Sequence, residues 1–176
     1  MTNNAVSTAY ISPFVCMKEH DSEDPVLCLS RVNFGNPTEA TFEEYAFAAG
    51  VLIKNGLRLG QPAFFLTRQV AELALKALLP TPTRGHDLDK LLNHLQAHGD
   101  DLLAGGTEQT KIVTFIRELH LYDPAGDGGR YSHTASNPPA PSLKDACHAE
   151  PELLLNELNR LVTYIAGRLG MPPFTV

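Results

Sequence analysis

The chain has 176 residues, of which 43% are hydrophobic and 19% charged, and its formal net charge is −6. This length suits a single domain with a sizeable core, and the composition excludes a disordered chain. No apolar run approaches the roughly 20 residues that a membrane-spanning helix needs, so we expect no membrane partner. Non-specific affinity for nucleic acid comes from clustered lysine and arginine. The acidic balance therefore excludes a broad DNA-binding surface and leaves only a local patch for any RNA or nucleotide.

Two features predict an intracellular protein. The first residues, Met-Thr-Asn-Asn-Ala-Val, lack the basic start and apolar run of a signal peptide, which favours a cytoplasmic location. The cysteines Cys16, Cys28 and Cys147 are odd in number and lack a close pairing pattern, so they do not predict a disulfide framework. Cys16 and Cys28 could face each other across a hairpin, and there we favour a reduced pair over a disulfide.

Residues 1–36 differ in pattern from the rest of the chain. Residues 10–18 and 26–34 are β-prone runs that a polar turn separates. Pro13 restricts the first run to an edge strand or an irregular arm, because proline cannot donate a ladder hydrogen bond. We therefore predict a short β-hairpin or arm over residues 1–36.

Helical patterning begins after Pro37 and continues to the region of Gly170. Apolar residues recur at spacings of three and four, and good helix formers dominate, so periodicity and local propensity agree. Capping residues, prolines and glycines mark the helix ends. The predicted helices begin at Thr38, Pro62, Asp87, Thr107 and near Pro151, and they end near Gly56 or Gly60, before Pro80, near His98, before Asp123 and before Gly170.

The apolar stripes of these helices predict a mainly α fold. We expect an up-and-down bundle of four to five helices over residues 37–170, with a tail at residues 171–176. Stripes of this kind are stable only when they are buried against one another. One common core should hold six residues from four of the helices: Leu73, Leu91, Leu95, Ile116, Leu158 and Ile165.

Three segments of the helical region follow one another in an informative order. They are residues 65–79 with the step Glu72-x-x-x-Lys76, residues 85–92 with the opening Gly85-His86-Asp87-Leu88, and Asp123 followed by Arg130-Tyr131. Over about residues 40–168 the chain thereby resembles the HEPN family, in its second helix, the start of its third helix and the loop after its fourth helix. The resemblance implies a helical domain that dimerises and associates with nucleotides or RNA.

The HEPN resemblance also implies a setting and a set of partners. Modules of this family commonly occur in bacterial toxin–antitoxin, defence and stress systems. There the partner is an antitoxin or nucleotidyltransferase-like protein, a nucleotide or an RNA. The resemblance implies a binding role of this kind without a cofactor.

The chain departs from the family in the residues of catalysis. HEPN ribonucleases carry an arginine and, about four to six residues further on, a histidine. Here only two residues separate Arg117 from His120 and Arg130 from His133. The comparison predicts a module without standard HEPN catalysis. The alternative is a metal-independent endoribonuclease that uses Arg130 and His133, or Arg117 and His120, for charge stabilisation and proton transfer.

Arg68, Glu72 and Lys76 recur every four residues and share one face of the second predicted helix; we call them the charge ladder. One interpretation is a solvated stripe on an otherwise apolar helix. The other is a polar cleft in which Arg68 or Lys76 holds a phosphate and Glu72 orients it. His86 stands just before a predicted helix start, where a structural role in the turn competes with proton transfer.

The densest polar cluster surrounds the long segment after the fourth predicted helix. It comprises Arg117, His120, Asp123, Arg130, Tyr131 and His133. The glycines of this segment, Gly126 among them, allow a close approach to a ligand. We predict that Arg130 and Tyr131 fold back to close a cleft against the charge ladder, with Arg130 meeting Glu72, Asp123 or a bound anion. The alternative is an ordered loop without a ligand.

His94 and His98 lie one helical turn apart, a spacing that suits a metal ion. Neither cysteine nor glutamate accompanies them in the same predicted helix. We therefore interpret them as two exposed histidines and predict no metal site.

The first predicted helix favours self-association. Phe42, Tyr45 and Phe47 spread around more of its surface than one core face can use. Together with the HEPN resemblance, this pattern predicts a homodimer.

Overall fold

The computed structural model describes residues 37–55, 59–126 and 149–176. The β-hairpin or arm predicted for residues 1–36 lies outside the described residues, as do all three cysteines. Arg130, Tyr131 and His133 also lie outside them, so the predicted closure over the charge ladder stays a prediction.

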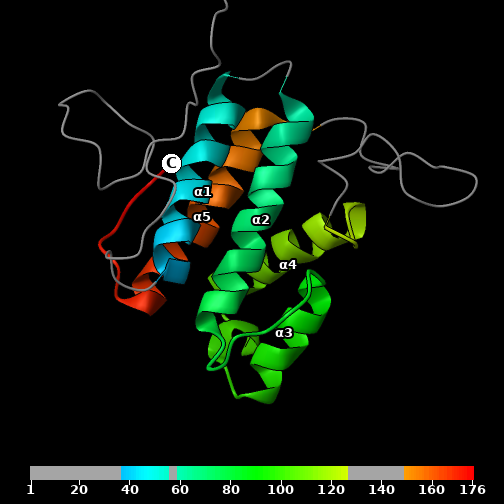
Figure 1. Ribbon diagram of the computed structural model, residues 1–176, viewed down its shortest axis with the longest axis vertical. Helices are drawn as coiled ribbons and strands as arrows, with labels where there is room; N and C mark the ends of the chain where they lie inside the picture. The colour runs from blue at the N-terminus through cyan, green and yellow to red at the C-terminus, as the bar shows by residue number, and fades with distance from the viewer. Residues whose placement is uncertain (1–36, 56–58, 127–148) are drawn as a thin grey trace, which may run out of the picture. The chain divides into compact units, whose positions relative to one another are not determined.

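Five α-helices and a short 3-10 turn make up the described part of the chain, which confirms the predicted mainly α bundle (Figure 1). The elements are α1 Pro37–Asn55, α2 Gly60–Leu78, α3 Leu88–Ala97, η2 Asp101–Leu103, α4 Thr107–Tyr122 and α5 Pro151–Leu169. None of these helices combines the length and the apolarity needed to cross a membrane.

Local sequence signals set several of the helix ends. The side chain of Asp87 accepts a hydrogen bond of 3.0 Å from the backbone N–H of Lys90 and so caps α3. Gly170 ends α5 in the left-handed conformation, with φ at 66°. Helix α2 begins at Gly60 rather than at Pro62. Pro62 fits in the first turn because the N–H that it lacks would have no partner within the helix.

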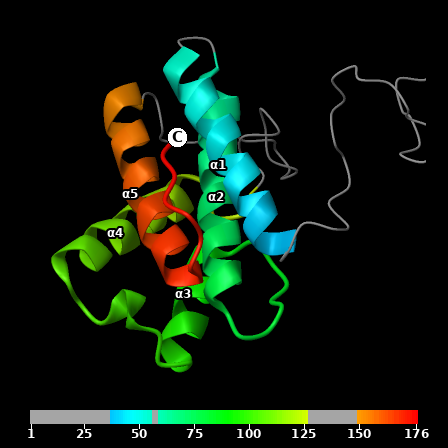
Figure 2. The same ribbon diagram turned by 90° about the vertical axis from the view of Figure 1, so that its left-hand side faces the viewer.

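Helix α2 is central to the bundle and contacts each of the other four α-helices. Helices α1 and α2 form an antiparallel pair, and α5 runs beside both of them (Figures 1 and 2). Helix α4 packs against α2, α3 and α5. As a result, α2, the segment that leads into α3 and the end of α4 meet on one side of the bundle.

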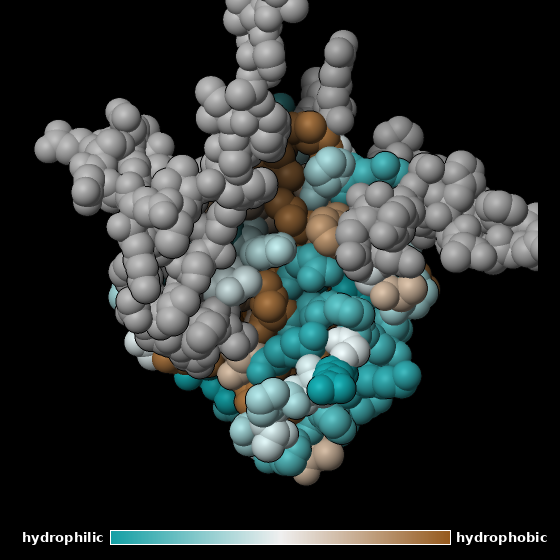
Figure 3. All heavy atoms as spheres, viewed as in Figure 1, coloured by the Kyte–Doolittle hydropathy of each residue, from teal (hydrophilic) through white to brown (hydrophobic). Residues whose placement is uncertain are grey.

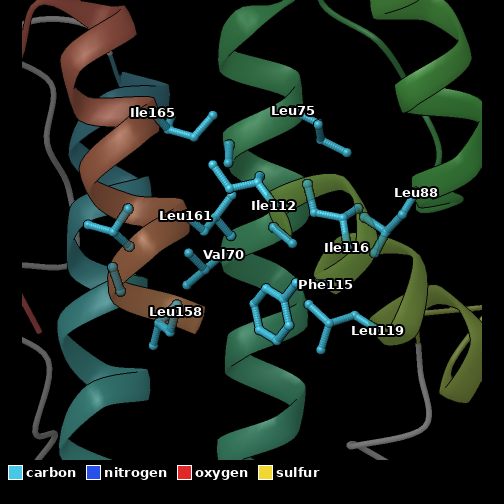
Figure 4. Packing of buried hydrophobic residues seen from close by; sticks show 14 of the residues in the cluster. Val70, Leu75, Leu88, Ile112, Phe115, Ile116, Leu119, Leu158, Leu161 and Ile165 are labelled. Carbon is cyan, nitrogen blue, oxygen red and sulfur yellow. The ribbon is translucent and has the colours of Figure 1, made fainter. Parts of the chain in front are cut away.

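One hydrophobic core joins the five helices. Five of the six residues predicted for it are buried there, and Leu73 is half-buried against its edge. Side chains from α2, α4 and α5, among them Val70, Ile116 and Leu161, face one another across this core (Figure 4). The apolar stripes of separate helices therefore do bury one another, as the sequence pattern indicates.

The three aromatic residues of α1 do spread around the helix, because Phe42 is buried in the core whereas Tyr45 and Phe47 are not. The Phe42 ring stands edge-on to that of Phe174, with ring centroids 6.1 Å apart. Tyr45 and Phe47 are exposed, and the Phe47 ring lies 5.5 Å from that of Phe174. The segment after α5 thus covers part of this face of α1.

That segment turns back and lies between α5 and α1 (Figure 2). The backbone N–H of Val176 donates to Oδ1 of Asn159 at 2.8 Å, and Nδ2 of Asn159 donates to the carbonyl of Val176 at 3.3 Å. Val176 is buried, and a Cβ atom on Gly50 would lie 2.8 Å from the Cβ atom of Val176. A glycine at this point of α1 therefore makes room for Val176.

Candidate functional site

The charge ladder of α2 faces the interior of the bundle. The Arg68 side chain is 0% exposed, that of Glu72 is 4% exposed, and that of Lys76 is 21% exposed. The interpretation as a solvated stripe is therefore wrong for Arg68 and Glu72. The alternative, a polar cleft in which Arg68 or Lys76 holds a phosphate, stays untested for Lys76, whereas Arg68 is fully buried and its donors meet acceptors of the protein itself.

Arg68 joins three parts of the chain. Its Nε donates to the backbone carbonyl of Asp123 at 2.9 Å and lies 3.5 Å from the Asp123 carboxylate. Its Nη1 donates to Oε2 of Glu72 at 3.1 Å, and its Nη2 donates to the backbone carbonyl of His86. Burying an arginine without partners would cost several kcal/mol, and these contacts offset that cost. Arg68 thus ties α2 to the segment before α3 and to the end of α4.

Glu72 is the acceptor that three neighbouring side chains share. Besides Arg68, Nζ of Lys76 donates to Oε1 at 2.7 Å, and Nδ1 of His86 lies 2.9 Å from Oε1 and 3.1 Å from Oε2. Burial raises the pKa of the Glu72 carboxyl, but the hydrogen bonds and charges of Lys76 and His86 outweigh burial and lower the pKa overall. Glu72 is therefore ionised and acts only as an acceptor.

The ionised state of Glu72 fixes the role of each ring nitrogen of His86. A carboxylate cannot donate, so Nδ1 of His86 carries the proton in this contact. In the neutral imidazole, Nε2 is then the nitrogen with the free lone pair. Within the described part of the chain Nε2 makes no hydrogen bond, and the His86 side chain is 55% exposed. His86 therefore presents a basic nitrogen to solvent, with a buried carboxylate behind it.

The turn after α4 is shaped around Arg68. Asp123 ends α4, and its Oδ1 accepts a hydrogen bond of 2.8 Å from the backbone N–H of Gly126. Gly126 has φ at 78°, a conformation that glycine adopts at no steric cost. A Cβ atom there would lie 2.8 Å from Nη1 of Arg68. Gly126 therefore permits a close approach to the protein's own guanidinium.

A pocket of about 580 Å³ opens beside these residues. In Figure 3 hydrophilic residues gather over α3 and the segment that leads into it. Arg68 holds two of the pocket's walls in place, because it binds the backbone of both His86 and Asp123. The lining comes from three places: residues 83–87 before α3, with Arg84, His86 and the acidic Asp87; Lys90, Leu91, Asn93 and His94 on α3; and Pro124 and Ala125 in the turn after α4.

Arg84 and Lys90 are the basic residues of the pocket that were not among the site residues predicted from the sequence. Arg84 is exposed and forms no ion pair with any described residue, whereas Lys90 pairs with Asp87 at 3.2 Å. Both lie close in sequence to the Gly85-His86 step, and this step is the sequence signal that could have pointed to them. The pocket that both residues line is completed by Pro124 and Ala125 after α4. The local sequence does not predict that the end of α4 packs there.

Arg117 and His120 lie outside the pocket. Both project from α4 toward the start of α3, where Nε of Arg117 is 3.8 Å from Oδ1 of Asp89 and Nε2 of His120 is 3.6 Å from Oδ2. Nδ1 of His120 is buried and has no hydrogen-bond partner among the described residues. The two predicted site residues therefore share one carboxylate, and the site around Arg68 is built without them.

The rings of His94 and His98 lie next to each other at the end of α3. Their rings are roughly perpendicular, with centroids 6.3 Å apart. Within residues 37–55, 59–126 and 149–176, no three side chains of histidine, cysteine, aspartate or glutamate are grouped so as to hold a metal ion. His94 lines the pocket, and His98 does not.

Comparisons of the chain with protein-family models, with curated proteins and with solved structures found no match. The resemblance to HEPN domains therefore stays a prediction from the sequence motifs. The contacts of Arg68, Glu72 and His86 are the physical basis for assigning a function.

Proposed function

We propose that the protein is an HEPN-like helical module that binds a phosphate-bearing ligand, a nucleotide or an RNA end, in the pocket beside Glu72. The proposal is carried by one observation: Arg84, His86 and Lys90 line a single pocket whose walls the buried Arg68 holds in place. Phosphate oxygens are acceptors, and guanidinium and ammonium groups are strong partners for them. The HEPN resemblance adds a bacterial defence or stress setting, in which the module acts by binding and without standard HEPN catalysis.

Arg84 and Lys90 have donors to offer such a ligand. Arg84 has no ionic partner among the described residues, and Lys90 has one, Asp87, whose carboxylate also caps α3. The backbone hydrogen bond from Lys90 lowers the pKa of the Asp87 carboxyl, which also lines the pocket. The chain has a net charge of −6, so its overall electrostatic field does not attract a phosphate. Binding would depend instead on short contacts with a few basic side chains, whose charges act mainly over short distances.

The charge ladder supports the pocket from behind. Arg68 is closed off from solvent, and Nζ of Lys76 is bound to Glu72 at 2.7 Å. We assign the contact with the ligand to His86 and the placement of its ring and backbone to the charge ladder. Walls that are ordered before binding raise affinity, since the ligand does not have to order them.

Calorimetric titration of the full chain with a short 5′-phosphorylated RNA, a nucleoside monophosphate and inorganic phosphate tests this proposal. Arg84→Gln and Lys90→Gln should each weaken binding about tenfold, the equivalent of one charge-assisted hydrogen bond. Lys111→Gln is the matched control, because Lys111 is also exposed and pairs with an acidic residue three positions earlier, but on α4. No binding of any of the three ligands, or an equal loss in the control, contradicts the proposal.

A second candidate is a metal-independent endoribonuclease that uses Arg117 and His120, or Arg130 and His133. It is favoured by the approach of Arg117 and His120 to the same Asp89 carboxylate, which places a guanidinium and an imidazole together. Incubation with labelled RNA in EDTA tests it. If the wild type cleaves the RNA and a folded His120→Ala or His133→Ala variant does not, catalysis is favoured. If the RNA stays uncleaved, the binding role is favoured.

We also propose that the module is a homodimer that associates through α1. Tyr45, Phe47 and Val51 are large apolar side chains exposed on that helix, and exposed apolar groups of this kind mark contact surfaces. Light scattering should return about twice the 19.2 kDa of one chain. Val51→Glu should return the mass of one chain, whereas Lys54→Glu, on the same helix, should not. A wild-type mass of one chain would contradict the dimer.

A further inference from the structure

His86 combines three properties that suit a nitrogen nucleophile. Its Nδ1 donates to Glu72, so Nε2 carries the free lone pair. The Glu72 side chain is 4% exposed and that of His86 is 55% exposed, so a buried negative charge supports the ring while a ligand can reach it. Arg84 and Lys90 line the same pocket and can hold phosphoryl oxygens.

We propose that Nε2 of His86 accepts a phosphoryl group from a donor with a phosphorus–nitrogen bond, the phosphoramidate class. This inference rests on the proposed function, because the pocket must first bind the phosphoryl group of the donor. It goes beyond binding, because the product is a phosphohistidine on the chain itself.

The transfer exchanges one phosphorus–nitrogen bond for another. The lone pair of Nε2 forms the new bond to phosphorus, and the bond to the donor nitrogen breaks with its electron pair going to the leaving ammonia. The donor reacts in the form that is already protonated on nitrogen, so ammonia leaves neutral and no further proton is needed. The imidazole keeps its proton on Nδ1 and becomes positively charged, and the Glu72 carboxylate compensates that charge.

The other described histidines lack this support. His94 and His98 have no acidic partner among the described residues, although His94 lines the same pocket. His120 has Asp89 near Nε2 at 3.6 Å, but its Nδ1 is buried. His86 is therefore the described histidine in which one ring nitrogen meets a buried carboxylate and the ring remains open to a ligand.

Incubating the full chain with potassium phosphoramidate, followed by intact-mass analysis and peptide mapping, tests the proposal. We expect one acid-labile, alkali-stable phosphoryl group on His86, formed at least about tenfold faster than on His94 or His98 because of the charge-assisted hydrogen bond to Glu72. His86→Ala should abolish this fast labelling, and Glu72→Gln should slow it about tenfold. His98→Gln, at the C-cap of the helix that carries His94 but outside the pocket, is the matched control and should label at the wild-type rate.

Nitrogen-15 NMR of the untreated wild-type protein provides a test that does not depend on whether a variant folds. We expect the neutral His86 ring to be protonated at Nδ1 and free at Nε2, and the opposite tautomer would overturn the proposal. Binding of inorganic phosphate without faster labelling of His86 overturns phosphoryl transfer alone. If neither binding nor labelling is found, the proposed function fails as well.

Discussion

A Cβ atom at Gly126 would lie 2.8 Å from Nη1 of Arg68, so the turn after α4 closes directly on the buried guanidinium. Gly126 also holds φ at 78° while its N–H donates to Asp123. Two separate physical reasons therefore favour glycine here, the left-handed backbone and the absence of a side chain. Gly99 also has a left-handed backbone, with φ at 74°, but nothing lies within 4 Å of a Cβ atom placed on it, so the two reasons can be separated.

Gly126→Ala should lower the free energy of unfolding by more than the left-handed backbone alone accounts for. In Gly99→Ala, φ is 74° and no atom lies within 4 Å of the added Cβ, so this control isolates the backbone cost, about 1 kcal/mol. The contact with Arg68 should add about 1–3 kcal/mol at Gly126. Urea denaturation of both variants measures the difference. Equal losses would mean that the guanidinium moves aside without cost.

Arg68→Met should destabilise the protein far more than Arg168→Met. Each arginine pairs with two acidic residues, but the Arg68 side chain is fully buried and that of Arg168 is 31% exposed. Without Arg68, Glu72 and Asp123 stay buried with fewer partners, so the free energy of unfolding should fall by about 3–5 kcal/mol. Water replaces the partners of an exposed charge, so Arg168→Met should cost about 1 kcal/mol or less. Similar losses for both variants in urea denaturation would refute the structural role of Arg68.

Local signals explain why the helices could be predicted from the sequence. Asp87 caps α3 through a contact three residues away, and Gly170 ends α5 through its own backbone conformation. Where apolar residues occupy one face of a helix and polar residues the opposite face, the pattern also predicts which face is buried. These signals need no knowledge of the neighbouring helices, and they predict a mainly α bundle.

The direction in which the charge ladder faces depends on contacts between distant segments. A spacing of four puts Arg68 and Glu72 on one face but does not state whether that face turns inward. The partners of Arg68 that decide this are the carbonyl of Asp123, 55 residues away in sequence, and that of His86, 18 residues away. The placement of Arg84 in the pocket has the same origin, since the end of α4 forms one of its walls.

Acid should remove the stabilisation that Glu72 provides. Burial raises the pKa of this carboxyl, but Lys76 and His86 together lower it below the ordinary value of 4.5. A carboxyl with a lowered pKa in the folded state stabilises the fold above its unfolded pKa, and this contribution is lost as the pH falls through the folded pKa. The difference in unfolding free energy between wild type and Glu72→Gln should therefore be constant near neutral pH and shrink below about pH 4.5.

Glu108→Gln is the control for this pH series. A hydrogen bond from Arg160 lowers the pKa of Glu108 as well, but Glu108 is exposed and its charge is screened by solvent. Its substitution should change stability little at any pH. A Glu72→Gln difference that keeps its neutral value down to about pH 3 would contradict the lowered pKa of Glu72 in the folded protein.

Asn159→Ala should release the segment after α5 from the bundle. Asn159 both accepts from and donates to the backbone of Val176, and losing these two part-buried hydrogen bonds should lower the free energy of unfolding by about 1–2 kcal/mol. Asn156→Ala, an exposed position about one turn earlier on α5, is the matched control and should have little effect. Released backbone is open to proteases, so carboxypeptidase should remove Val176 faster from Asn159→Ala than from the control. Equal trimming rates for the two variants would show that packing of Val176 against Gly50, rather than the side chain of Asn159, holds this segment in place.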